Sequence, residues 1–289
     1  MLKLAASLCR ERLDAGLSSA ALVLMLLIPL LEIILRPLLG QGVENAPVLV
    51  QHLGLLLAMF GALVAERGGH LTSLGGGWSP KGGLGKAGRL FQRASASGVC
   101  ALLAYASWSF VRSEMDAPQA LAYGISGWWF QLAMPLGFTW LAIRQAWRMG
   151  EWGHWRILPA VLLPMLAWWL GKQCDGASLL LWPLAIWLVF MLLLGAPIFA
   201  VLGGLALALF GSEGQPLASV PLSHYQITVN PSLPALPLFT LAGLVFARTQ
   251  AAVRLGGVFS ALFGQGARGT AIAAAALCSC FTALTGGAA

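Results

Sequence analysis

The run ILPAVLLPMLAWWLG, residues 157–171, decides how this chain is arranged, because it sets the side of a membrane on which every later segment lies. As an α-helix its 15 residues span about 22 Å, whereas the hydrocarbon core of a bilayer is about 30 Å thick. The flanking residues extend its reach. Trp155 and Trp168 suit the two membrane interfaces, and the charged ends of Arg156 and Lys172 reach water. We therefore predict that residues 157–171 cross the membrane.

The distribution of lysine and arginine supports this crossing. If residues 157–171 cross and the N-terminus is cytoplasmic, only Arg36, Arg112 and Lys172 among the basic residues lie outside. If they do not cross, every later residue changes sides and the distribution becomes less one-sided. Cytoplasmic loops of membrane proteins are rich in lysine and arginine. The charges therefore predict a multi-pass protein whose N-terminus is cytoplasmic.

The composition predicts an all-α polytopic membrane protein. Hydrophobic residues make up 58% of the 289 residues and charged residues only 9%, against roughly 25% charged residues in soluble domains. The net charge of +7 follows from basic cytoplasmic loops and does not indicate nucleic acid. The other predicted spans are 17–39, 46–65, 94–111, 121–143, 177–194, 196–211, 233–247 and 269–289. Only Gly195 separates the spans 177–194 and 196–211, which predicts a tight helical hairpin, and the segment after Arg248 has an amphipathic helical face.

The predicted spans divide the chain into two modules and a connection. Residues 1–150 hold four spans and return the chain to the cytoplasm, while residues 177–289 begin a second module from the outside. Residues 151–176 then carry the chain across the membrane between them. This is the arrangement expected of two membrane subunits fused into one chain.

Few residues inside the predicted spans carry chemistry. Glu32 and Arg36 lie four residues apart on one helix face, as a polar contact or docking point, or as an ion pair that satisfies itself. Glu44, just before the second span, is a third candidate for such a contact. His52 lies in the second span, either as a proton relay or as a hydrogen-bonded packing residue. No catalytic triad, carboxylate pair or HExxH motif occurs, so we expect no enzyme, no cofactor and no metal site.

The last residues, TALTGGAA (282–289), combine a hydroxyl with two glycines in an apolar run. Glycine pairs in such runs often mark helix packing. They also suit a broken helix, which frees carbonyl oxygens for a cation such as Na⁺. On that reading Thr285, Gly286 and Gly287 form the cation-binding tip of a re-entrant hairpin.

Three segments of the second half resemble the start of the large membrane subunit of TRAP (tripartite ATP-independent periplasmic) transporters. They are LLLGAPIFAVLGG (192–204), LPALPLFTLAG (233–243) and GQGARGTAIAAAALCSCFTALTGG (264–287). Residues 1–150 resemble the four-helix small subunit, through Arg36, Glu44 and Pro135. The chain departs from the family at Gly287, where a serine is common, and at Leu244, where a glutamate is common.

The resemblance implies a fused permease of the bacterial inner membrane with an elevator-type transport module. Such a permease takes a small organic anion, often a carboxylate, from a periplasmic solute-binding protein, and Na⁺ is the coupling ion. It implies that residues 177–289 are the N-terminal part of an incomplete, C-terminally truncated module. Two alternatives stay open: a Na⁺ symporter for divalent anions that needs no binding protein, and a membrane scaffold that does not transport.

Overall fold

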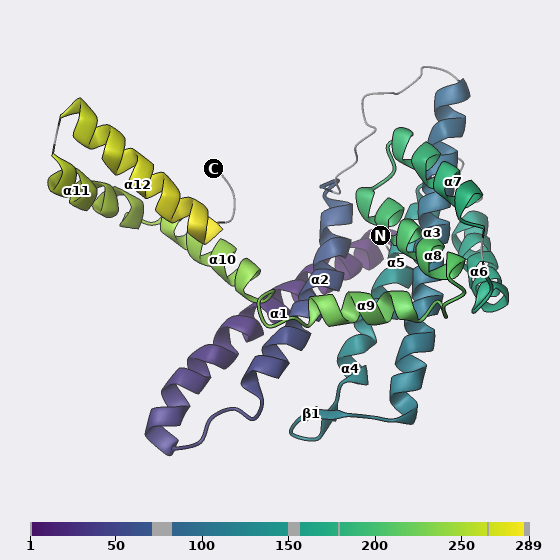
Figure 1. Ribbon diagram of the computed structural model, residues 1–289, viewed down its shortest axis with the longest axis horizontal. Coiled ribbons are helices and arrows are strands. Elements are labelled where there is room, and N and C mark those ends of the chain that lie inside the picture. Colours follow the sequence, from purple (N-terminus) through teal and green to yellow (C-terminus); the bar gives the residue numbers. More distant parts are fainter. Residues whose placement is uncertain (1, 71–82, 150–156, 179, 265, 286–289) are drawn as a thin grey trace.

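A computed structural model describes residues 2–70, 83–149, 157–178, 180–264 and 266–285. The chain is 79% helical, and its helices are arranged as shown in Figure 1. In chain order the elements are α1 (Leu2–Leu39), α2 (Ala46–Arg67), α3 (Gly83–Asp116), β1 (Ala120–Ala122), β2 (Ile125–Ser126), α4 (Trp128–Gln131), α5 (Ala133–Trp147), α6 (Ile157–Cys174), α7 (Leu181–Leu193), α8 (Ile198–Ser212), α9 (Ser219–Thr228), α10 (Ala235–Arg248), α11 (Ala251–Phe263) and α12 (Ala267–Thr285).

Among the described residues, three helical segments are long and apolar enough to cross a membrane: Asp14–Leu39, Ala46–Arg67 and Gly85–Asp116. They contain the first three predicted spans. They differ in how far they are buried by the rest of the chain. In the most apolar window of each segment, 11% is buried for Asp14–Leu39 and 67% for Gly85–Asp116. The chain therefore has the long apolar helices of a helical membrane protein, and α3 is the most enclosed of them.

The fourth predicted span, 121–143, is not one continuous helix. Its first residues belong to the antiparallel hairpin β1–β2, and the helical part begins afterwards as α4 and α5. The hairpin turns at Tyr123 and Gly124, whose φ values of 50° and 74° lie in the left-handed region that glycine adopts readily. The all-α prediction is wrong for this segment, because apolar composition alone does not separate a short strand from a helix.

The deciding run 157–171 lies within α6, whose 18 residues correspond to about 27 Å. This helix packs against α3 and α5. At Gly171 a side chain would approach Tyr105 Cδ1 to 2.7 Å, and the Tyr105 ring meets Trp168 edge-on at 5.2 Å. The predicted helix is confirmed and its crossing stays a prediction; Trp155 and Arg156 lie outside the described residues.

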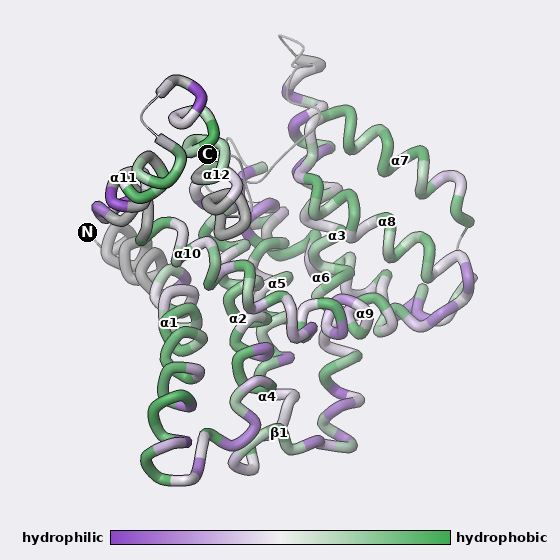
Figure 2. The backbone as a smooth tube through the Cα atoms, turned by 60° about the vertical axis from the view of Figure 1, so that its left-hand side comes forward, coloured by the Kyte–Doolittle hydropathy of each residue, from purple (hydrophilic) through white to green (hydrophobic). Residues whose placement is uncertain are grey.

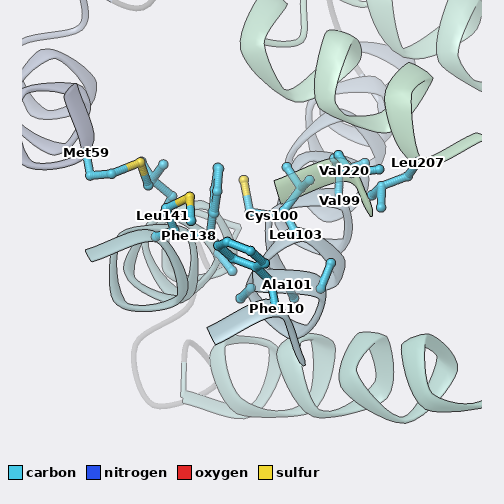
Figure 3. Close-up of a cluster of buried hydrophobic side chains, with 14 of the residues drawn as sticks. Met59, Val99, Cys100, Ala101, Leu103, Phe110, Phe138, Leu141, Leu207 and Val220 are labelled. Carbon is cyan, nitrogen blue, oxygen red and sulfur yellow. The ribbon is translucent and has the colours of Figure 1, made fainter. Parts of the chain in front are cut away.

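The main hydrophobic core surrounds α3 and joins helices from both predicted modules. Met59 and Phe138 contribute from α2 and α5, Val99 comes from α3 itself, and Leu207 and Val220 come from α8 and α9 (Figure 3). Helices α8 and α9 accordingly pack against α3. The helices that follow the connection therefore lie on the first module, while the division at 150 and 177 stays a prediction.

Helices α7 and α8 form the predicted tight helical hairpin. Gly195 turns the chain with φ 84°, and its carbonyl accepts a hydrogen bond from Gln92 Nε2 of α3 at 2.6 Å. Gly204 lets α8 approach its neighbours closely, since a Cβ there would lie 2.6 Å from Leu188 Cδ2. Both glycines are required by position, one for its backbone angle and the other for its lack of a side chain.

The last three helices extend away from the core helices (Figure 1). Helix α12 packs against α10 and α11, and α10 also contacts α1. Helix α11 covers the amphipathic segment that begins after Arg248 in the sequence, and its apolar residues Val258 and Leu262 are exposed. Exposed apolar side chains of this kind suit a lipid environment.

Candidate functional site

The predicted cation-binding tip lies at the edge of the described residues. Helix α12 ends at Thr285, while Gly286 and Gly287 lie outside the described residues. Within the helix, Ser279 Oγ bonds back to the Ala275 carbonyl at 2.9 Å, so this hydroxyl is used by its own helix. The ligand role of Thr285, Gly286 and Gly287 therefore stays a prediction.

The predicted pair Glu32–Arg36 lies at the end of α1 and holds the following turn. Arg36 Nη2 is 2.8 Å from Glu32 Oε1, and Glu32 Oε2 accepts a hydrogen bond from the Val43 amide at 2.5 Å. Gly42 leaves room for this carboxylate, because a Cβ at that position would collide with it. The Glu32 side chain is 19% exposed and that of Arg36 is 75% exposed, so the guanidinium is the outward-facing group.

Glu44 fastens the same turn to the hairpin β1–β2. Its Oε2 accepts a hydrogen bond from the Tyr123 amide at 3.0 Å, and its own amide donates to the Tyr123 hydroxyl at 3.1 Å. Beside it, Asn45 Nδ2 donates to the Leu121 carbonyl at 2.6 Å. The structure thus brings the three predicted contact residues, Glu32, Arg36 and Glu44, to one polar turn. Sequence reasoning missed Tyr123, which lies far from them in the chain.

A cavity of about 590 Å³ opens beside this polar turn, between α1, α2 and the segment that precedes α10. Glu32 and Arg36 line one end, together with Asn45. Most of the remaining wall is apolar. The other lining residues are Pro29, Ile33, Val43, Ala46, Pro47, Val50, Gln51, Pro231 and Pro234.

His52 is held inside the helices by two hydrogen bonds. The residue is 2% exposed, and its Nδ1 lies 2.7 Å from the Val48 carbonyl oxygen, which accepts the Nδ1 proton. Its Nε2 lies 2.7 Å from the Tyr225 hydroxyl and accepts the hydroxyl proton. The centroid of the Phe130 ring lies 5.4 Å from that of the imidazole ring. With both nitrogens engaged, the geometry favours the packing interpretation over the proton relay. The partner Tyr225 lies 173 positions along the chain, where no local sequence signal identifies it.

A second polar cluster, also missed by sequence reasoning, joins Asp14 in α1 to the C-terminal ends of α2 and α5. Arg144 lies 2.5 Å from Asp14 and 3.4 Å from Glu66. Arg67 approaches Asp14 to 3.0 Å, and Arg148 approaches Glu66 to 2.9 Å. Glu66 is only 1% exposed. The positive-inside distribution accounts for these arginines only as cytoplasmic charges. The sequence signal for the cluster is that opposite charges recur at matching ends of three predicted spans.

Comparisons with protein-family models, with curated proteins and with solved structures found no match for this chain. Among the described residues, no group of three or more histidine, cysteine or acidic side chains could hold a metal ion. The described residues form a helical bundle with a polar turn, a neighbouring cavity, the His52–Tyr225 hydrogen bond and the ion-pair cluster around Arg144.

Proposed function

We propose that the chain forms part of a Na⁺-coupled secondary transporter that receives small organic anions from a periplasmic solute-binding protein. It would act as a multi-pass permease of the bacterial inner membrane with a cytoplasmic N-terminus, and it would not be an enzyme. The proposal rests on the resemblance of residues 1–150 and 192–287 to the two TRAP membrane subunits.

The order of helices along the second half agrees with this resemblance, which is the observation that carries the proposal. The resembling segment 192–204 covers the turn and the start of α8, the segment 233–243 covers the start of α10, and the segment 264–287 covers α12. The tight turn falls at Gly195, one of the residues on which the resemblance depends. The order of these helices is compatible with such a module and supports the proposal.

The end of α12 supports a cation site in this proposal. The C-terminal end of a helix carries a partial negative charge from its aligned carbonyl groups. Glycines are poor helix formers, so Gly286 and Gly287 favour a break after Thr285. If the break lies inside the membrane, it would direct carbonyl oxygens at Na⁺, as in transporters with discontinuous helices.

The polar turn supports a docking role for the solute-binding protein. Glu32 and Glu44 use their carboxylates to hold the turn, whereas Arg36 is 75% exposed. On the adjoining hairpin Tyr123 and Ile125 are 63% and 42% exposed. A rigid turn with one exposed cation and exposed apolar side chains suits a transient protein contact.

Uptake measurements on the intact permease in liposomes test the proposal. With its binding protein present, uptake of a labelled carboxylate should require an inward Na⁺ gradient and should be lost when the gradient is absent. Thr285→Ala should weaken the dependence on Na⁺, and Thr270→Ala on the same helix is the matched control. Uptake that is unchanged without Na⁺ would contradict the proposal.

The same experiment separates the two alternatives. A divalent-anion symporter would take up substrate without any binding protein, because it needs no delivery step. A membrane scaffold would give no uptake under either condition. The helical architecture suits both alternatives, and only the resemblance favours the binding-protein-dependent transporter.

A further inference from the structure

The cavity beside the polar turn continues along α2 into a second one. The second cavity, of about 250 Å³, shares Pro234 with the first and is lined by Gly54, Leu57 and Ala58 of α2. These positions follow Val50, which lines the first cavity, by one to two helical turns. The two cavities therefore lie next to each other along α2, against the segment before α10, and together they are called the groove.

The groove changes from polar to apolar along its length. The charged pair Glu32–Arg36 stands at the end where α1 and α2 meet, while Leu57, Leu233 and Leu236 line the far end. In the hydropathy view, α1 is largely hydrophobic down to its end, and the hydrophilic residues near the turn gather at the start of α2 (Figure 2). A molecule that fits this groove needs a polar head and an apolar tail.

The length of the groove matches one leaflet of a bilayer. From Ala46 at the start of α2 to Ala58 the helix rises about 18 Å, while half the hydrocarbon core is about 15 Å. The combined volume lies in the ordinary range of ligand cavities. A lipid tail therefore fits lengthwise beside α2, with its headgroup level with Arg36.

The charges at the polar end indicate the headgroup. Arg36 is paired through one nitrogen and 75% exposed, so its other N–H groups are available to a phosphate. The Glu32 carboxylate keeps acceptor capacity beyond the two contacts described, which suits an ammonium group. Because the pair is neutral overall, an additional net negative charge on the ligand gains little.

We propose that this groove binds a phospholipid with an ethanolamine headgroup. Its phosphate contacts Arg36, its ammonium contacts Glu32, and one acyl chain lies along α2 as far as Ala58. The bound lipid fills the space between the α1–α2 pair and the segment 231–237, and it thereby fixes the approach of α10 to α1. This inference does not depend on the transport function. It assigns the Arg36 guanidinium to the lipid and leaves the exposed Tyr123 and Ile125 for contact with a binding protein.

Native mass spectrometry of the purified chain with added phospholipids tests the proposal. The chain should retain phosphatidylethanolamine several-fold more than phosphatidylglycerol of the same acyl chains. Arg36→Gln should lower the retained ethanolamine lipid about tenfold, since a charge-assisted contact is lost. Arg112→Gln, which removes another exposed arginine from the end of a long helix, should leave retention unchanged.

A second variant tests the tail site without touching the charges. Ala58 lines the second cavity and is exposed. Ala58→Trp therefore fills that cavity with little effect on folding, and it should reduce the amount of lipid retained. Leu24→Trp, at a 45% exposed position of α1, is the matched control. Equal retention by Arg36→Gln and Arg112→Gln, or equal binding of the two lipids, would overturn the proposal. Disulfide-linked dimers through Ile33→Cys would also overturn it, by assigning the groove to a second copy of the chain.

Discussion

Replacing Arg144 by methionine should destabilise the chain strongly, because this arginine joins two buried carboxylates. Its guanidinium lies 2.5 Å from Asp14 and 3.4 Å from Glu66, and its side chain is 16% exposed. It also donates to the Leu63 carbonyl at 2.8 Å. Methionine keeps much of the side-chain volume and removes the charge, so the change isolates the electrostatic contribution.

The size of the loss in unfolding free energy depends on which partners Asp14 and Glu66 keep in the Arg144→Met variant. Removing one member of a buried ion pair typically costs about 3–5 kcal/mol, because the other charge is left uncompensated. Here Asp14 keeps Arg67 at 3.0 Å and Glu66 keeps Arg148 at 2.9 Å. We therefore expect the lower end, about 3 kcal/mol of unfolding free energy. This loss corresponds to a change of roughly a hundredfold in the unfolding equilibrium.

Denaturant titration in detergent micelles, followed by tryptophan fluorescence, measures this free energy. Arg112→Met, at an exposed arginine of α3, is the control and should stay within about 0.5 kcal/mol of wild type. Adding Asp14→Asn to Arg144→Met should recover part of the loss, because the Asp14 carboxylate, which would keep only Arg67, then no longer carries a partly compensated charge. A loss below about 1 kcal/mol for Arg144→Met, or no recovery in the double variant, would refute the reasoning.

Two further predictions use the same unfolding assay. A double-mutant cycle of His52→Phe and Tyr225→Phe should give a coupling of about 0.5–1.5 kcal/mol, as expected for one buried hydrogen bond, whereas additive effects would speak against that bond. Gly204→Val should cost about 1–3 kcal/mol through overpacking, because its Cβ would lie 2.6 Å from Leu188. Gly98→Ala on α3, with nothing within 4 Å, should be neutral or stabilising, and equal losses for the two glycines would exclude close packing as the cause.

The sequence alone determined the features that depend on local composition. Apolar runs of sufficient length predicted the first three long helices, since a membrane helix needs only an uninterrupted apolar stretch. The position of Gly195 between two apolar runs predicted the tight turn between α7 and α8. In the structure Gly195 has a φ of 84°, which glycine adopts readily. The deciding run 157–171 also forms the helix expected of it.

The same reasoning missed features in which local signals compete. The hairpin at 120–126 interrupts an apolar stretch, and its turn at Tyr123 is stabilised by Glu44 from a distant loop. Hydropathy records how apolar a segment is and carries no information about such a partner. The helical interpretation of this stretch was therefore reasonable locally and wrong in the folded chain.

Only the tertiary structure decided which polar groups meet. Glu32 and Arg36 pair within one helix, so their spacing was enough to predict contact. His52 and Tyr225, or Arg144 and Asp14, are separated by 173 and 130 positions and meet because their helices pack together. The sequence shows which charged and hydrogen-bonding residues need partners. The packing of the helices around α3 determines which residues become those partners.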